Sequence, residues 1–103
     1  MIARTWRGRT RAADGDRYAQ YVSRTGLAGY RGTPGNRGAL LLHRVDGESA
    51  EILTISFWDS LDDVRAFAGD DISRAVFYPE DDAYLIDRDE HADHWDVAEA
   101  DLP

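Results

Sequence analysis

The stretch ALLLHRVDGESAEILTISFW, residues 39–58, decides the fold. An apolar run at residues 39–45 precedes Asp46-Gly47, and a second run extends over residues 50–58. Because Asp-Gly is a strong signal for a two-residue β-turn, the two runs are predicted to form a β-hairpin. Residues 50–58 carry apolar side chains on both faces, which predicts a strand in the centre of the sheet.

The segment before this hairpin predicts a strand and a helix. Residues 2–9 are compatible with a short strand, and the apolar spacing after Asp14 or Asp16 predicts a one-sided helix that ends at Gly26. Residues 27–38 hold four glycines and a proline, which predicts a loop.

The segment after the hairpin predicts a second helix and a last strand. Residues 60–69 begin with a capping box and end at a glycine, as a short helix does. A further helical turn is predicted at 72–77, a solvated acidic turn at 80–82, and a polar strand at 87–97.

This order of elements predicts an α+β fold of the ferredoxin-like βαββαβ type. Both helices are expected on one face of a four-stranded antiparallel sheet with the strand order 4-1-3-2. Residues 1–97 are expected to form one domain, followed by a tail at 98–103. The other face of the sheet is partly apolar, so we expect a two-fold homodimer to cover it.

The charge composition excludes some classes of partner. The chain has 12 arginines, no lysine and 20 acidic residues, for a net charge of −8, which argues against binding to nucleic acid or to a membrane. It has no cysteine and no apolar run of about 18 residues, which favours a cytoplasmic protein. Residues 1–45 carry +7 and residues 46–103 carry −15. In the predicted sheet, basic residues of the first strand face acidic residues of the last: Arg4, Arg7 and Arg9 against Asp87, Asp89, Glu90 and Asp93.

Three segments resemble the antibiotic biosynthesis monooxygenase family of dimeric α+β barrels. They are PGNRGALLLHR (Pro34–Arg44), the Asp-Gly turn, and LTISFWDSLDDVRAF (Leu53–Phe67). That family includes oxygenases that act on aromatic polyketides without metal or flavin, quinol oxygenases and heme-degrading enzymes. Trp58 matches a tryptophan of the heme-degrading members, but their asparagine on the first strand and their histidine on the second helix are missing here, which argues against heme.

The resemblance implies a monooxygenase, without a cofactor, that acts on a polycyclic or quinol-like aromatic and molecular oxygen. Such a site needs a base, a partner for the oxyanion and a dry aromatic cleft. His94 is the first candidate for the base, because histidine titrates near neutral pH, unless it is a surface residue of an edge strand. Arg4 is the candidate oxyanion partner, unless it pairs with Asp87 or Asp89. His91 and His94 point to opposite faces of a strand, so no metal site is expected.

The remaining candidates bind the substrate. Trp6, Trp58 and Tyr78 are expected to form walls of a pocket for a flat ligand, unless the two tryptophans fill the core. Asn36 and Arg37 are candidates for hydrogen bonds to a quinone oxygen. Two other functions stay open at this point: a non-oxidative cyclase or dehydratase in the same barrel, and a ligand-binding or stress-response dimer without turnover.

Overall fold

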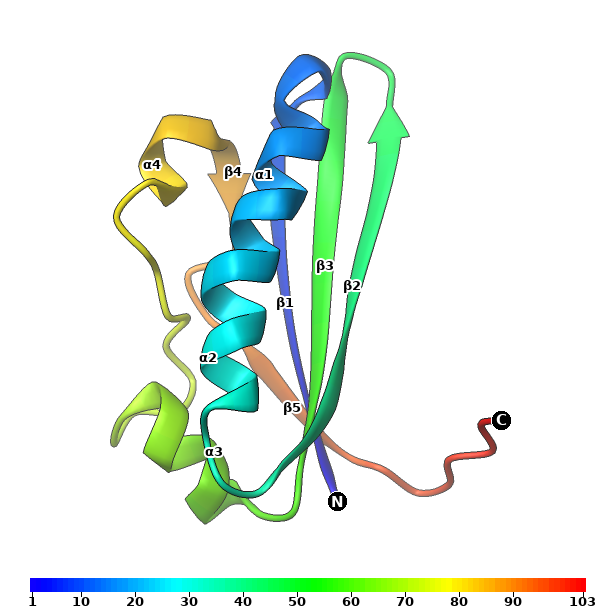
Figure 1. Cartoon of the computed structure of the whole chain (residues 1–103), viewed down its shortest axis with the longest axis vertical. Helices are drawn as coiled ribbons and strands as arrows, with labels where there is room; N and C mark the ends of the chain where they lie inside the picture. The colour runs from blue at the N-terminus through cyan, green and yellow to red at the C-terminus, as the bar shows by residue number, and fades with distance from the viewer.

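The hairpin forms the core of the sheet in the computed structural model, which describes residues 1–103 (Figure 1). Strand β2 (Asn36–Asp46) pairs antiparallel with β3 (Ser49–Trp58), as predicted. Gly47 adopts a φ of 64° in the turn, a conformation that other residues rarely adopt. Alternate residues of β3 from Ala50 to Trp58 are buried under the helices.

Strand β1 (Ile2–Arg11) lies on the other side of β3 and pairs with it over its whole length. Strands β4 (Leu85–Arg88) and β5 (Asp93–Asp96) both pair with the free edge of β1. The order β2-β3-β1-β4, with β5 also beside β1, confirms the predicted ferredoxin-like α+β fold. The predicted strand at 87–97 is instead two short strands, because the chain between them hydrogen-bonds to another segment.

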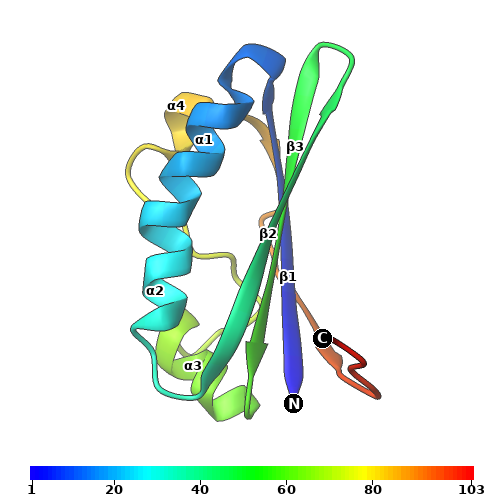
Figure 2. The same cartoon turned by 45° about the vertical axis from the view of Figure 1, so that its right-hand side comes forward.

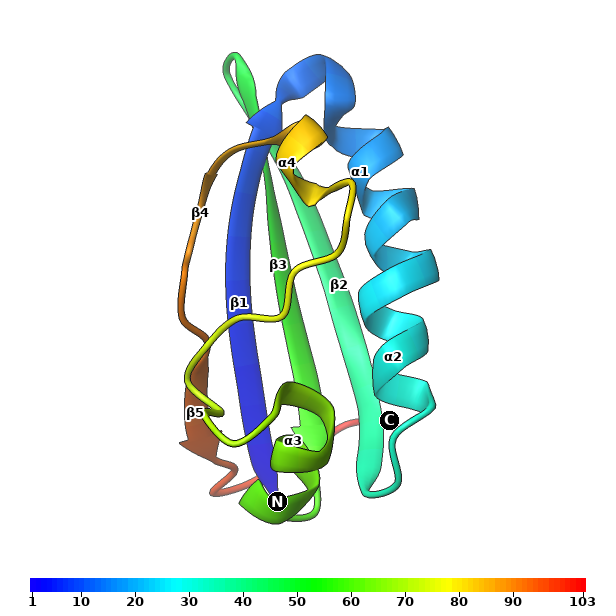
Figure 3. The same cartoon turned by 90° about the vertical axis from the view of Figure 1, so that its left-hand side faces the viewer.

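That other segment is residues 69–80, which connect the second helix, α3 (Leu61–Ala68), to α4 (Asp81–Tyr84) and have no regular secondary structure. Ala75 N donates to Glu90 O at 3.0 Å, and Ala92 N donates to Ser73 O at 2.8 Å. The helical turn predicted at 72–77 is therefore wrong, because these backbone groups bond across to the edge chain rather than within a helix. Figure 3 shows this irregular segment crossing the front of β1 between α3 and α4.

The first helical region is longer than predicted. A short 3-10 turn (Ala12–Asp14) leads into α1 (Gly15–Val22), a π-helical turn (Ser23–Leu27) and α2 (Ala28–Arg31). The stop predicted at Gly26 is wrong, since glycine permits a left-handed helix end but does not impose one. The loop predicted over residues 27–38 is confined to residues 32–35, because helix and strand occupy the rest. These helices cover one face of the sheet, and the opposite face has no helix over it (Figure 2).

The second helix agrees with the prediction. Helix α3 (Leu61–Ala68) begins where the Ser60 side chain accepts a hydrogen bond from the Asp63 backbone, and it ends at Gly69, whose φ is 90°. Helix α4 (Asp81–Tyr84) follows the irregular segment. Asp81 is 5% exposed, so the acidic turn predicted at 80–82 is not solvated throughout.

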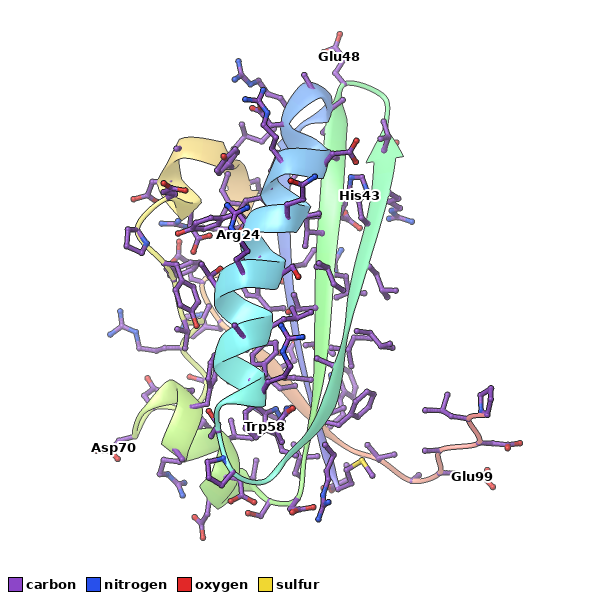
Figure 4. The ribbon with its side chains drawn as sticks, viewed as in Figure 1. Arg24, His43, Glu48, Trp58, Asp70 and Glu99 are labelled. Carbon is purple, nitrogen blue, oxygen red and sulfur yellow. The ribbon has the colours of Figure 1, made fainter.

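The core between sheet and helices consists of two apolar clusters. One contains Tyr18, Tyr21, Val22 and Ile52 and lies near the hairpin end of the sheet. The other contains Tyr30, Trp58 and Val64 and lies near the N-terminus, where Trp58 sits under the helices (Figure 4). The stretch of sheet between them carries Arg4, Trp6, Thr54 and Ser56, so its centre is largely polar.

The charged side chains pair differently from the prediction. The first strand does lie beside the last one, with Arg9 opposite Asp87. However, Arg9 forms its ion pair with Glu51 of β3 at 3.6 Å, and neither Arg4 nor Arg7 forms an ion pair. The register therefore confirms which strands are neighbours, whereas the predicted ion pairs between them are wrong. No helix is long and apolar enough to cross a membrane.

Candidate functional site

A cavity lies over the polar centre of the sheet, between the two apolar clusters. It offers about 40 Å³ to water-sized molecules, or about 440 Å³ when all the open space at its mouth is counted. The floor comes from β1 and β3, with Arg4, Trp6 and Thr54. The π-helical turn contributes Thr25 and Gly26, whose small side chains leave space that a regular apolar helix face would fill. π-helical turns occur often at functional sites. The 40 Å³ is smaller than the roughly 300 Å³ of small-molecule pockets, so a ligand larger than a few waters requires lining side chains to move.

Arg4 is the main charged group of the cavity floor and is only 4% exposed. Its guanidinium donates to two backbone carbonyls of the irregular segment, Ile72 O at 2.5 Å and Arg74 O at 3.0 Å. The alternative in which Arg4 pairs with Asp87 or Asp89 is wrong, because no carboxylate lies within ion-pair distance of it. Burial lowers the pKa of Arg4 from its ordinary value, but arginine stays protonated in proteins. Arg4 is thus a buried cation without a counter-ion.

His94 lies beside Arg4 on the helix-covered side of the sheet. Arg4 Nη1 is 2.9 Å from His94 Nε2, and the two residues are opposite each other in the β1–β5 register. Because a guanidinium can only donate, Nε2 accepts and the ring proton lies on Nδ1. Burial, and then the charge of Arg4, lower the pKa of His94. His94 does not line the cavity, so its geometry favours holding Arg4 over taking a proton from a ligand.

The aromatic residues named from the sequence separate into two groups. Trp6 and Tyr78 line the cavity, and Trp6 donates from Nε1 to Asp89 O at 2.8 Å. Trp58 does not line it: the side chain is fully buried, its Nε1 donates to Ser56 Oγ at 2.9 Å, and its ring packs on Tyr30 edge to face. The expectation that Trp58 walls the pocket is therefore corrected, because it fills the core.

Asn36 and Arg37 also lie away from the cavity lining. The Asn36 side chain closes the bulge at the start of β2, donating to Phe57 O at 3.0 Å and accepting from Gly38 N at 3.1 Å. Arg37 pairs with Asp59 at 2.7 Å on the surface. Their expected contact with a quinone oxygen is corrected, because both side chains are engaged in holding the strand end.

Two residues of the site were not singled out in the sequence, Tyr18 and Asp81. Both line the cavity, and the Tyr18 hydroxyl donates to Asp81 Oδ1 at 2.9 Å. Burial, followed by the negative charge of Asp81, raises the pKa of Tyr18. Burial also raises the pKa of Tyr78. Periodicity does place Tyr18 on the buried side of the first helix, but nothing local marks Asp81, since it lies in a run of acidic residues.

Solved structures show where else this fold occurs. No protein-family model and no curated protein sequence matches the chain. A crystal structure of a MhuD mutant with two manganese protoporphyrin IX molecules bound per active site matches with a TM-score of 0.68 and 16% identity, over 100% of this chain and 99% of that one. NE2512, a protein of unknown function from Nitrosomonas europaea, matches with a TM-score of 0.66 and 13% identity, over 99% and 93%. These likenesses show the fold, and it agrees with the one that the monooxygenase resemblance implies.

The first of these structures corrects the expectation that a cofactor is absent and heme excluded. In that structure, a protein with this fold has a metalloporphyrin bound in its active site, so fold alone does not argue for a site without one. Whether this chain can hold a porphyrin depends on the residues that line its own cavity. Proteins hold heme iron through histidine, cysteine, methionine or tyrosine, and here the lining offers only tyrosines.

The three lining tyrosines are poor iron ligands. Tyr30 is 7% exposed and its ring packs against Trp58 and Phe67. The raised pKa values of Tyr18 and Tyr78 oppose the phenolate that iron ligation requires, and the Tyr18 hydroxyl is already bonded to Asp81. Of the groups on a porphyrin, only a carboxylate finds a matching partner, Arg4. The lining therefore does not fit an iron porphyrin held by an axial ligand.

Proposed function

We propose that this protein is a small oxygenase whose cavity binds a planar, phenolic or quinol-like aromatic with an anionic oxygen at Arg4. The observation that carries the proposal is the burial of the Arg4 guanidinium in an aromatic cavity without a carboxylate partner. A buried charge is costly unless it is paired or used, and an oxyanion of a bound ligand would pair with it. Hydrogen bonds between charged groups contribute about 1.5–3 kcal/mol each.

The chemistry follows from stabilising that anion. A deprotonated anthrone or dihydroquinone is electron-rich enough to pass an electron to O₂. For an anthrone-type substrate, a methylene group and O₂ give a ketone and water, so atoms and electrons balance. In this proposal Arg4 stabilises the developing charge, His94 holds Arg4 in place, and Trp6 and Tyr78 enclose the ring and exclude water.

The proposal includes a homodimer formed through the helix-free face of the sheet. Leu40, Leu42 and Trp95 project from this face and are 46%, 44% and 59% exposed. With the half-buried Ile55 and Phe57 of β3 they make a continuous apolar surface. A second copy would cover it with an identical surface, as two-fold symmetry allows.

Oxygen uptake tests the function. Purified protein is mixed with a model anthrone or a dihydroquinone, and O₂ consumption and product are recorded with and without added hemin. We expect uptake above background, lost in Arg4→Met and kept in Arg31→Met, which removes an exposed arginine of α2. Absence of uptake with all these substrates contradicts the proposal, and a product formed without uptake indicates non-oxidative chemistry. A Soret shift that saturates with hemin and disappears in Arg4→Met indicates that a porphyrin carboxylate occupies the same site.

A further inference from the structure

Asp81 is the second buried charge of the cavity, and neither the fold resemblance nor the proposed oxyanion site gives it a role. It is 5% exposed, begins α4 and lines the cavity. Its Oδ1 accepts from the Tyr18 hydroxyl at 2.9 Å, and its Oδ2 accepts from the Tyr78 backbone N–H at 2.6 Å. No cation lies within ion-pair distance of it. Each carboxylate oxygen has two acceptor positions, so capacity is left for a ligand.

Asp81 and Arg4 have opposite charges and line one cavity, yet they do not pair with each other. Tyr18, the partner of Asp81, packs on Ile52 of β3. Ile52 is opposite Gly8 of β1, and Arg4 lies four residues along β1 from Gly8. Four residues of strand span about 13 Å. Figures 1 and 3 show α4 near the hairpin end of the sheet and the start of β1 at the other end. The two charges therefore belong to opposite ends of the cavity.

The groups around Asp81 favour a carboxylate that stays in place. Tyr18 of α1 donates to it, the Tyr78 backbone of the irregular segment donates to it, and Arg88 of β4 is a cation whose charge acts on Tyr18. The Tyr21 hydroxyl accepts a hydrogen bond from Glu80 N at 3.0 Å, which fixes the start of α4. A buried, oriented carboxylate next to an aromatic ligand has the position that a general base requires.

We infer that Asp81 is the proton acceptor of the cavity and that Tyr18 positions it. This rests on the proposed function and names its substrate class: an anthrone-type ketone whose acidic C–H faces Asp81 while the conjugated carbonyl oxygen on the opposite side of the ring faces Arg4. The C–H bond breaks, its proton bonds to a carboxylate oxygen of Asp81, and its electron pair moves through the ring to the carbonyl oxygen at Arg4, which becomes an enolate. The step is a proton transfer and needs no oxidant.

Anaerobic hydrogen–deuterium exchange separates this step from oxygenation. Anthrone is incubated with the protein in D₂O without O₂, and loss of the methylene proton signal is followed by NMR. We expect Asp81→Asn to slow the protein-catalysed exchange by about 10²–10⁴-fold, with an unchanged thermal unfolding curve as the check on folding. The amide can keep both contacts, accepting from Tyr78 N–H and donating to the Tyr18 oxygen. Asp82→Asn, which changes the exposed neighbour that pairs with Arg88, is the matched control and should keep the full rate.

Steady-state kinetics of the exchange test the role of Tyr18. Its hydroxyl orients the carboxylate, so Tyr18→Phe should lower kcat about tenfold and leave KM nearly unchanged. An increase in KM with an unchanged kcat contradicts the positioning role, because it means that Tyr18 only shapes the cavity. Exchange that Asp81→Asn slows by less than about tenfold, or no catalysed exchange in the unmodified protein, overturns the inference. Exchange that depends on Asp81 in a protein that takes up no O₂ supports it while the oxygenase proposal fails.

Discussion

The two faces of the sheet carry opposite kinds of side chain. The face under the helices is buried, yet its centre holds Arg4, Thr54 and Ser56, while the uncovered face exposes Leu40 and Leu42. A chain that folded only for its own stability would place apolar groups inside and polar groups outside. In our proposals, the inner polar centre serves a ligand and the outer apolar face serves a partner. Four experiments test this comparison.

The largest expected effect concerns the apolar end of the inner face. Trp58→Ala should lower the free energy of unfolding by about 3–5 kcal/mol, because it empties space between Tyr30 and Phe67 that no other side chain can fill. Chemical denaturation measures it. Leu42→Ala on the outer face is the control and should cost less than about 1 kcal/mol in dilute monomer. Equal losses of unfolding free energy in the two variants would contradict the difference between a buried inner face and an exposed outer face.

The next effect concerns the outer face. Leu42→Asp should raise the dissociation constant of the dimer at least about 100-fold, because symmetry places two unpaired carboxylates in the apolar interface. Analytical ultracentrifugation over a concentration series measures this constant. Ala28→Asp, on the exposed side of α2, should leave it unchanged. A protein that is monomeric before any substitution contradicts the role given to this face.

A smaller effect separates the two tryptophans of the inner face. Trp6→Leu should weaken the binding of a hydroxyanthraquinone by about tenfold and should cost less stability than Trp58→Ala, because Trp6 lines the cavity and Trp58 does not. Quenching of tryptophan fluorescence measures the binding. A Trp58→Phe variant should keep the affinity. If Trp58→Phe weakens binding more than Trp6→Leu does, the cavity is not the ligand site.

The smallest effect is the pH dependence that His94 contributes. Its pKa is lowered in the folded state, so the unfolded chain binds the proton first as the pH falls below about 6.5. The free energy of unfolding should therefore decrease from about pH 6.5 down to the lowered folded-state value, and His94→Gln should remove this slope. NMR titration should show the His94 pKa rising towards its ordinary value in Arg4→Met. A pKa that does not move contradicts the contact between the two groups.

The sequence contained most of the fold because the fold depends on local signals. The Asp-Gly turn, the apolar run of residues 50–58 and the Ser60 cap each act over a few residues, and each is found as predicted. The helix end predicted at Gly26 was wrong because a glycine inside a helix and one at its end look the same in sequence. Residues 72–77 were misassigned because their hydrogen bonds go to residues 90–92, far along the chain.

The site was harder to predict for the same reason. Arg4 was predicted as the oxyanion partner and Trp6 and Tyr78 as walls of the pocket, and all three do line the cavity. Trp58 faces the same side of the sheet as Trp6, but its ring packs against Tyr30 and Phe67. This difference depends on tertiary packing and has no local signal in the sequence. Asp81 is buried because Tyr18, 63 residues away, reaches it.

The irregular segment bears on how the protein tolerates mutation. Arg4 is bound by the main-chain oxygens of residues 72 and 74, and every amino acid supplies such an oxygen. A saturation-mutagenesis screen should therefore find position 4 intolerant, while positions 72 and 74 accept many residues and still hold the guanidinium. Residues 72 and 74 contribute to the site through the position of their backbone and not through their side chains. A deletion or insertion between α3 and α4 should consequently be more damaging to ligand binding than any single replacement within that segment.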